Sequence, residues 1–372
     1  MEMINESTVS KRKGINVELI RASTINPEPV TWLWRDWLAA GKLHVLGGAP
    51  GTGKTTIALD FAAVISSGRC WPDGSPARCG NVVIWSGEDD PKDTLIPRLL
   101  QAGANMDSIF FIAGVQEGKK NRSFDPAIDM EPLLKKLEEI GNVRLLIVDP
   151  IVSVVTGDSH KNAEVRRSLQ PLVDLAGRLG CALVGITHFS KATHGRNPVE
   201  RLTGSLAFGA LARVVLVVAK LPKEDDEDEM TWLLMRAKSN IGPDEGGFVY
   251  QLQQNELANH PGVCGSFIKW KQFVEGSARD WLASAEKTNE GKCQGALEKA
   301  IQFLSELLMN GPLPQADIEA QYLHAGHSHS TMRRAKSNLG IQSVKAGGYF
   351  GSEDQQWLWT LPNTVTEDED IG

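Results

Sequence analysis

A glycine-rich stretch followed by lysine and threonine contains the residue types that can hold a polyphosphate. Residues 48–55 fit the pattern G-x-x-x-x-G-K-S/T, with an apolar run before them and a helical pattern after them. Glycines let backbone N–H groups turn toward an anion, and the following helix directs its positive N-terminal end at the same point. Lys54 is expected to reach the β- and γ-phosphates, and Thr55 to place its hydroxyl on Mg²⁺. The pattern predicts an ATP site formed by Gly48, Ala49, Pro50, Gly51, Thr52, Gly53, Lys54, Thr55 and Thr56.

A plain glycine turn between a strand and a helix is the alternative, but such a turn would need neither Lys54 nor Thr55.

An apolar run that ends in an aspartate supplies a second part of the site. Mg²⁺ in phosphoryl-transfer sites is held by an acidic residue at the end of a neighbouring buried strand. Residues 145–148 are apolar and are followed by Asp149. We expect Asp149 to hold Mg²⁺ through water; a purely structural carboxylate is the alternative.

Hydrolysis also needs a carboxylate that orients the attacking water. Many ATPases carry it directly after the magnesium-binding aspartate, where this chain has Pro150. The predicted strand 81–86 is followed by Glu88, at the edge where ligands bind in open α/β sheets. We expect Glu88 to be the catalytic base, with Asp89 and Asp90 capping the next helix. The alternative is that all three acids cap that helix.

A histidine follows the last of the predicted parallel strands. The strand at 181–187 ends next to His188, on the same edge of the sheet. A polar side chain there can contact the γ-phosphate and report its presence to the loop beyond, so we expect His188 to act as a sensor. A histidine that is simply packed and hydrogen-bonded is the alternative.

Alternating strands and helices must position these residues. Several strand candidates are continuously apolar, which is typical of strands covered on both faces. The predicted strands are 42–47, 81–86, 108–112, 143–148 and 181–187, and the predicted helices are 54–67, 91–103, 129–140 and 162–179. Runs at 212–219, 230–237, 246–253 and 265–273 predict antiparallel strands that extend the sheet, with an acidic hairpin tip at 224–229. The fold class is therefore α/β, a doubly wound and mostly parallel sheet with an antiparallel extension.

Composition divides the chain into five consecutive parts. They are a flexible N-terminal arm at 1–28, an ATPase core at 29–275, a polar linker at 276–294, a small domain at 295–362 and an acidic tail at 363–372. Three helices followed by a β-hairpin predict a winged-helix-like fold for the small domain, whose first helix carries Leu297, Ile301, Leu304 and Leu308 on one face. The three tryptophans within 32–37 are expected to pack against the sheet rather than on a nucleotide base.

Overall composition excludes several classes of protein. The formal net charge is -7, which excludes a generally basic protein that coats DNA but not local basic loops. The five cysteines are scattered and form no C-x-x-C motif, which favours reduced thiols in a cytoplasmic protein. No apolar run approaches the ~18–20 residues of a membrane span, so we expect no membrane partner.

The combined motifs resemble the RecA-type ATPases of the RepA plasmid-helicase group. The resemblance covers roughly residues 29–255 and rests on motifs at 48–56, 86–89, 146–149, 186–188, 203–208, 212–213 and 237–240. It implies a RecA-like core in a ring, with ATP at subunit interfaces. In such a ring Glu88 is the catalytic glutamate and His188 the sensor.

The resemblance also implies that Arg213 acts in trans as an arginine finger on the γ-phosphate of a neighbouring subunit, where added positive charge stabilises the transition state. An internal salt bridge of Arg213 is the alternative. Lys238 is a second finger candidate. Related replicative helicases carry Lys-x-Arg here, whereas this chain has Lys238, Ser239 and Asn240, so the division of labour between Arg213 and Lys238 stays open.

Three segments are candidates for contact with DNA. Two are the loops at 151–161 and 190–203, where basic residues could follow phosphates in a central channel, although a solvated loop is the alternative. The third is the helix after residue 328 of the winged-helix-like domain, a fold that also docks proteins. The predicted DNA-binding residues are Lys191, Arg196, Arg201, Arg333, Arg334 and Lys336.

These features together predict a ring-forming, DNA-dependent ATPase that hydrolyses Mg-ATP. By resemblance it is a replicative-type DNA helicase of a plasmid, phage or prophage module. Its expected partners are single-stranded DNA in a central channel and replication proteins. The subunits are expected to form a homo-oligomer, a hexamer. An ATP-switched DNA-binding adaptor without unwinding activity is the main alternative, and a recombination-type filament is a third.

Overall fold

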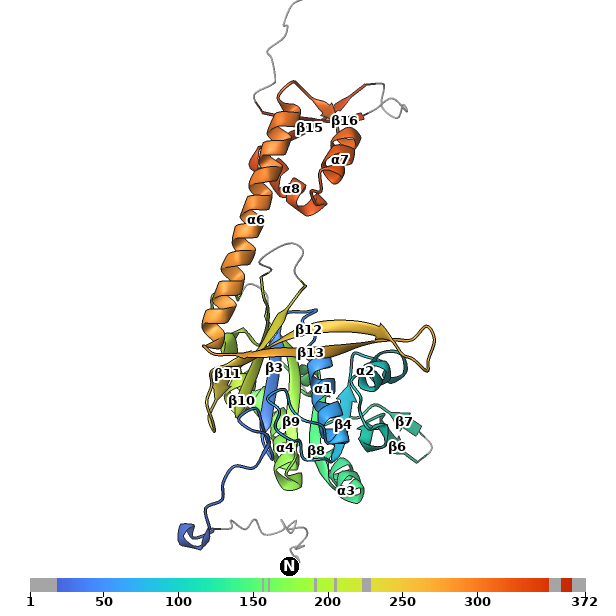
Figure 1. Ribbon diagram of the computed structural model, residues 1–372, viewed down its shortest axis with the longest axis vertical. Coiled ribbons are helices and arrows are strands. Elements are labelled where there is room, and N and C mark those ends of the chain that lie inside the picture. The colour runs from blue at the N-terminus through green and yellow to red at the C-terminus, as the bar shows by residue number, and fades with distance from the viewer. Residues whose placement is uncertain are drawn as a thin grey trace, which may run out of the picture.

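A nine-stranded sheet forms the centre of the larger part of the molecule (Figure 1). The structure, a computed structural model, describes residues 19–118, 120–155, 157–159, 161–190, 193–203, 206–222, 229–347 and 356–362, with only the backbone for 287–294. In spatial order the strands are β13 (Cys264–Val274), β12 (Gly247–Glu256), β11 (Trp232–Ser239), β10 (Val214–Lys220), β3 (Leu43–Gly48), β9 (Ala182–His188), β8 (Val143–Asp149), β4 (Asn81–Ser86) and β5 (Ile109–Phe111). The predicted α/β class with a large, mostly parallel sheet is confirmed.

The directions of neighbouring strands differ from the prediction at one pairing, that of β10 with β3. All pairings from β5 to β10 are parallel, and the pairings among β10, β11, β12 and β13 are antiparallel. The predicted antiparallel strand at 212–219 is confirmed on the side of β11, but on its other side β10 runs parallel to β3. The reason is the short helix α5 (Leu206–Leu211), which carries the chain back across the sheet between β9 and β10.

Helices cover both faces of this sheet. Strand residues alternate between two apolar cores: Leu46 belongs to the core with helix α1, and the adjacent Val45 belongs to the core with helix α4. This alternation explains why the strands are apolar at consecutive positions. The helices are α1 (Lys54–Ser67), a π-helical turn (Pro91–Leu95) leading into α2 (Ile96–Gln101), α3 (Met130–Ile140) and α4 (Asn162–Leu179).

The tryptophan-rich segment packs on the face that α1 covers. Trp34 is fully buried and stacks between Trp37 and Trp71, with ring centroids 4.7 Å and 5.0 Å away. Phe61 of α1 meets Trp34 edge-on at 5.7 Å. The expected packing role is confirmed for Trp34 and Trp37, since both side chains lie in the core.

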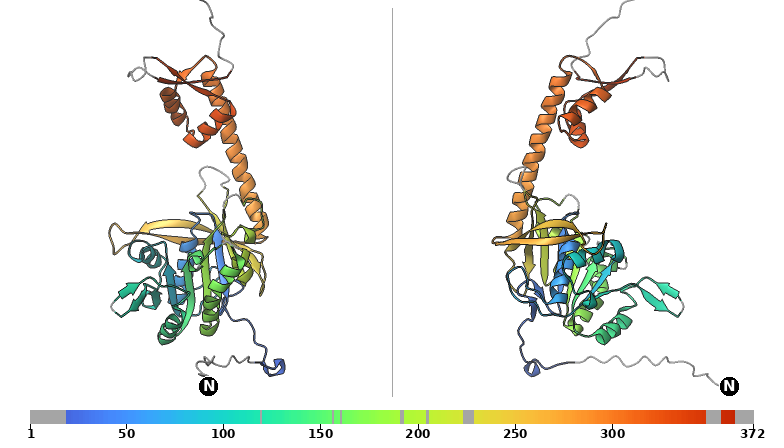
Figure 2. Two further views of the ribbon diagram at one scale, coloured as in Figure 1. Left: turned by 180° about the vertical axis from the view of Figure 1, so that it is seen from behind. Right: turned by 45° about the vertical axis from the view of Figure 1, so that its right-hand side comes forward.

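A small unit follows at the far end of a long helix (Figure 2). Helix α6 (Ala278–Leu308) has 31 residues, so residues 278–294 of the expected linker are helical and continuous with the first helix of the C-terminal unit. The other elements of the unit are α7 (Gln315–His324), α8 (His329–Asn338), β14 (Leu313–Pro314), β15 (Gln342–Ala346) and β16 (Gln356–Thr360). Leu304 and Leu308 are fully buried there, as the predicted apolar face requires.

Shorter elements complete the described chain. They are β1 (Trp32–Trp34), β2 (Leu38–Ala39), β6 (Val115–Glu117), β7 (Lys120–Arg122) and the 3₁₀ turns Ala22–Thr24, Met106–Ser108, Ile151–Val154 and Pro198–Arg201. Residues 1–18 of the predicted arm, 223–228 of the acidic tip and the tail 363–372 lie outside the described residues. Among the described helices, none combines the length and the apolar character that crossing a membrane requires.

Candidate nucleotide-binding site

The predicted phosphate-binding loop connects the central strand β3 to helix α1. Gly51 and Gly53 adopt left-handed φ values of 73° and 78°, which favour glycine, and α1 begins directly after them at Lys54. The N-terminal end of a 14-residue helix therefore faces the loop. This arrangement of backbone N–H groups and helix dipole suits an anion.

Lys54 lies buried beneath the loop. Its Nζ donates a hydrogen bond to Ala49 O at 2.9 Å, and Thr52 Oγ1 donates to the same carbonyl at 2.8 Å. Burial lowers the pKa of Lys54 to about 8, and Asp149 and Glu88 oppose that shift through their charge. The site thus holds a desolvated ammonium group that a polyphosphate would stabilise.

The two predicted magnesium ligands lie side by side. Thr55 Oγ1 donates a hydrogen bond to Asp149 Oδ2 at 2.7 Å. Burial raises the pKa of Asp149 to about 6, while the hydrogen bond from Thr55 acts in the opposite direction. Adjacent hydroxyl and carboxylate oxygens are the hard donors that Mg²⁺ prefers, so this pair fits the ion. Strand β8, which carries Asp149, is not the direct neighbour of β3, because β9 lies between them.

The sheet brings Glu88 to the same edge. Ser86 of β4 pairs with Asp149 of β8, and Gly87 N donates to Asp149 O at 2.8 Å, so Glu88 follows directly beside the magnesium pair. Asp90 accepts a hydrogen bond from Lys92 N at 2.7 Å and caps the next helical turn. Capping by Asp90 was expected; Asp89 instead forms an ion pair with Arg98 at 3.1 Å.

The end of β9 carries polar atoms without partners. His188 pairs in register with Gly48, next to the phosphate-binding loop. Among the described residues, Thr187 Oγ1 and His188 Nδ1 are buried and have no hydrogen-bond partner. Burial lowers the pKa of His188, and the charge of Lys54 adds to this shift, so a neutral imidazole faces the site. Buried polar atoms of this kind suit a bound ligand or water.

A cavity of about 330 Å³ unites these residues. Among the predicted site residues, its lining contains Gly51, Gly53, Lys54, Thr55, Thr56, Glu88, Asp149 and His188. Gly48, Ala49, Pro50 and Thr52 belong to the loop but do not line the cavity. Sequence reasoning missed Arg98, Leu252 and Ser266, which also line it. The basic residue at 98 was visible eight residues after the acidic cluster, whereas β12 and β13 carry no signal that links them to the loop.

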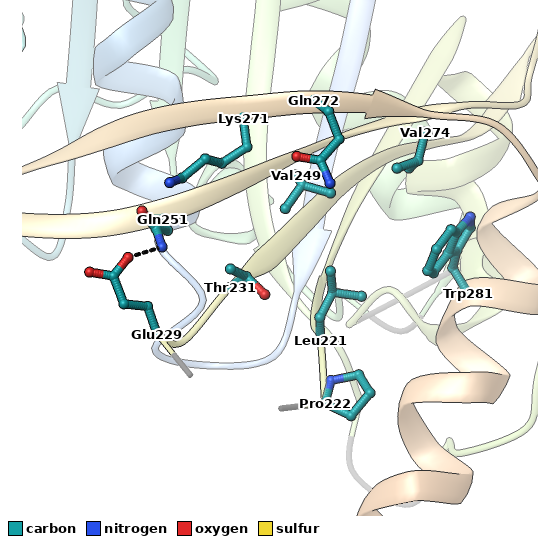
Figure 3. A pocket seen from close by; sticks show the side chains of 10 residues that line it. All are labelled: Leu221, Pro222, Glu229, Thr231, Val249, Gln251, Lys271, Gln272, Val274 and Trp281. Atoms are coloured by element: carbon teal, nitrogen blue, oxygen red, sulfur yellow. Dashed lines mark hydrogen bonds between the residues drawn. The ribbon is translucent and has the colours of Figure 1, made fainter. Parts of the chain in front are cut away.

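A larger cavity, of about 580 Å³, lies on the opposite face of β12 (Figure 3). Its lining includes Val249, Gln251, Lys271 and Trp281. None of the predicted site residues lines this cavity, so cavity size alone does not locate the chemistry.

The two finger candidates lie at the opposite end of the sheet from the cavity. Val218 of β10 is level with Gly48, and Arg213 precedes it by five residues, roughly 16 Å at about 3.3 Å per residue. Lys238 Nζ donates to Gly209 O at 2.7 Å and to Ala212 O at 3.1 Å, where it satisfies the last carbonyls of α5. Arg213 is exposed and forms no ion pair within the described part of the chain.

The predicted DNA-binding residues fall into different environments. Arg201 is buried, with Nη2 at 2.6 Å from Glu286 Oε1 of α6 and its guanidinium 4.5 Å from the Phe189 ring centroid. Lys336 lies 3.9 Å above the Trp359 ring and donates to Ser343 Oγ at 2.6 Å. Both residues make internal contacts rather than facing solvent freely. Arg196, Arg333 and Arg334 are exposed, and Lys191 lies outside the described residues.

Comparison with known proteins identifies the family. A protein-family model described as AAA domain matches residues 7–194, about half of the chain. The matched stretch contains the phosphate-binding loop, Glu88, Asp149 and His188, and it ends before Arg213. No curated protein matches the chain. The chain belongs to the AAA domain family of P-loop ATPases, which includes RecA-like, helicase-related members.

Proposed function

We propose that the chain is a ring-forming, DNA-dependent ATPase that completes each ATP site with a residue from the next subunit. The observation that carries this proposal is the position of Arg213. It is an exposed cation at the far end of β10, roughly 16 Å from the level of Gly48 at about 3.3 Å per residue. Arg213 therefore cannot serve the site of its own chain, but it can serve the site of a second copy.

The roles within one site follow from the geometry. The loop and Lys54 hold the β- and γ-phosphates, and Thr55 with Asp149 would hold Mg²⁺, which supplies charge neutralisation when bound. Glu88 is placed beside Asp149 to orient the attacking water. His188, with an unpartnered nitrogen beside Gly48, senses the γ-phosphate. Arg213 of a neighbour adds positive charge as the transition state forms.

The distance between Arg213 and the phosphate-binding loop also determines which kind of contact the subunits can make. A contact between the Arg213 end of one subunit and the nucleotide end of the next joins two different surfaces. Heterologous contacts of this kind close into rings or continue as filaments. Lys238 is less suited to act across the interface, because its ammonium already binds carbonyls of α5. We therefore assign the finger to Arg213 and a structural role to Lys238.

Contact with DNA is the basis for the helicase role. Arg196 lies exposed in the loop that follows His188, so this loop is close in the chain to the proposed sensor of the nucleotide. Arg333 and Arg334 are exposed on α8 of the winged-helix-like unit. We propose that these residues contact DNA phosphates and that the ring acts as a replicative-type helicase of a plasmid, phage or prophage module.

An ATP-switched DNA-binding adaptor is the second candidate. The internal contact of Arg201 with Glu286 favours it, because it removes one of the cations that a translocating channel would use. In that case ATP controls assembly and the C-terminal unit recognises DNA.

Mixing two inactive variants tests the shared site. Arg213→Ala subunits keep an intact ATP site, and Lys54→Ala subunits keep an intact Arg213. A mixture should regain ATPase activity at interfaces that join the two, although each variant alone is inactive. If no ratio restores phosphate release while both variants still assemble, the shared site is refuted.

Strand displacement on a forked duplex then separates the two candidates. Unwinding that requires ATP and is lost in Glu88→Gln supports the helicase. ATP hydrolysis without any unwinding favours the adaptor.

A further inference from the structure

Strand β12 separates the two cavities described above. Side chains of a strand alternate between its faces, so neighbouring residues serve different cavities. Leu252 lines the nucleotide cavity, and Tyr250 lies in the same core as α1. Val249 and Gln251 line the larger cavity on the other face (Figure 3).

Tyr250 reaches the phosphate-binding loop from this strand. The side chain is fully buried, and its hydroxyl donates a hydrogen bond to Thr52 O at 2.6 Å. Its ring packs between Trp232 and Trp270, with centroids 6.1 Å and 5.5 Å away. Trp270 Nε1 in turn donates to Asp60 Oδ2 of α1 at 2.8 Å. The hydroxyl therefore has a fixed position relative to both the loop and the helix that follows it.

The hydroxyl is also a permanent donor. Burial raises the pKa of Tyr250 well above its ordinary value, so the hydroxyl stays protonated at neutral pH. A carbonyl buried in a loop needs a donor, because no water can reach it.

The peptide that Tyr250 holds is the one that presents Gly53. The Thr52–Gly53 bond is trans, so the carbonyl of Thr52 and the N–H of Gly53 point in opposite directions across one rigid plane. With the carbonyl fixed toward Tyr250, the N–H of Gly53 points away from the Tyr250 hydroxyl. Leu252 packs close to Gly53 and leaves no room for a side chain there, since a Cβ on Gly53 would lie 2.6 Å from Leu252 Cδ2.

We propose that Tyr250 is a positioning residue for the phosphate-binding loop, and that its hydroxyl sets the direction of the Gly53 N–H toward bound phosphate. The proposal rests on the nucleotide function proposed above. Without the hydroxyl, the buried carbonyl loses its donor and the peptide plane can rotate, which turns the N–H away from the phosphate. ADP and ATP should be affected equally, because loop N–H groups hold the phosphates that both nucleotides share.

The test compares two tyrosine-to-phenylalanine variants. Tyr250→Phe keeps the ring and its aromatic neighbours and removes only the hydroxyl. Tyr322→Phe is the matched control: Tyr322 is also buried, and its hydroxyl lies 2.6 Å from His329 Nδ1 in the C-terminal unit. We would measure affinities for Mg-ADP and Mg-ATP by calorimetric titration, well below the melting temperature of each variant.

We expect Tyr250→Phe to bind both nucleotides about tenfold more weakly and Tyr322→Phe to bind them as the wild type does. Wild-type affinity in Tyr250→Phe overturns the proposal. Equal weakening in both variants also overturns it, because the loss then comes from general destabilisation.

Lys54→Ala separates this inference from the function beneath it. If Lys54→Ala loses ATP binding and Tyr250→Phe does not, only the role of Tyr250 is refuted. If Lys54→Ala binds ATP normally, the loop is not the nucleotide site and both proposals fail.

Discussion

The buried carboxylate of Asp60 makes the stability of the sheet unit depend on pH in an unusual direction. Asp60 lies on α1, six residues after Lys54, with an exposed fraction of 6 %. Burial raises its pKa from 3.8 to about 6, although the hydrogen bond from Trp270 and the charge of Arg69 act against the shift. The folded protein therefore binds this proton more tightly than the unfolded chain does.

The sign and size of the effect follow from this difference. Because the folded state holds the extra proton, the contribution of Asp60 to the free energy of unfolding falls as pH rises from about 4 through about 6. A shift of roughly two pKa units corresponds to about 3 kcal/mol at 1.36 kcal/mol per unit. The loss is complete above the folded-state pKa.

Asp60→Asn removes the charge and keeps an oxygen that can accept the Trp270 hydrogen bond. We expect the variant to be more stable than the wild type by up to about 3 kcal/mol at pH 8, and to lose this advantage at pH 4. Urea unfolding followed by tryptophan fluorescence measures this difference in stability. Trp34, Trp71 and Trp270 report on it because they lie in the apolar core beside α1, the helix that carries Asp60.

Asp174→Asn, at an exposed position of α4, is the control and should change the free energy of unfolding by less than about 0.5 kcal/mol at either pH. A stability difference between Asp60→Asn and wild type that is the same at pH 4 and pH 8 would refute the reasoning.

Two further predictions concern the proposed reaction and the proposed DNA contact. Glu88→Gln should bind Mg-ATP with wild-type affinity but release phosphate at least ~100-fold more slowly, because an amide cannot orient and deprotonate water as a carboxylate does; normal turnover in a phosphate-release assay would place the base at another residue. The double variant Arg333→Ala/Arg334→Ala should weaken DNA binding and lower the slope of log K against log salt by about 0.7 to 0.9 for each lost phosphate contact. An unchanged slope in salt titrations would indicate that α8 of the C-terminal unit docks another macromolecule.

Local sequence was sufficient for the elements of the site. The phosphate-binding loop was predictable from a strand, a glycine-rich turn and a helix, and the residues that form this motif lie between 43 and 67. The strand that ends at Asp149 was recognisable because it is buried on both faces and therefore continuously apolar. Prediction did not foresee that β10 is parallel to β3 as well as antiparallel to β11, since this depends on how the chain with the preceding six-residue helix crosses the sheet.

The amino-acid sequence by itself thus predicted a site for a nucleotide-like anion between β3 and α1, because the signals for that site are contiguous. Only the tertiary structure decided which distant residues join it. The strand order places Glu88 beside Asp149, and the antiparallel extension brings Tyr250 to Thr52 across 198 positions of the chain. It also distinguishes two neighbouring cations, since Lys238 binds carbonyls of α5 whereas Arg213 is exposed. Such pairings depend on the order and direction of strands, which arise from packing of the whole sheet and leave no local pattern in the sequence.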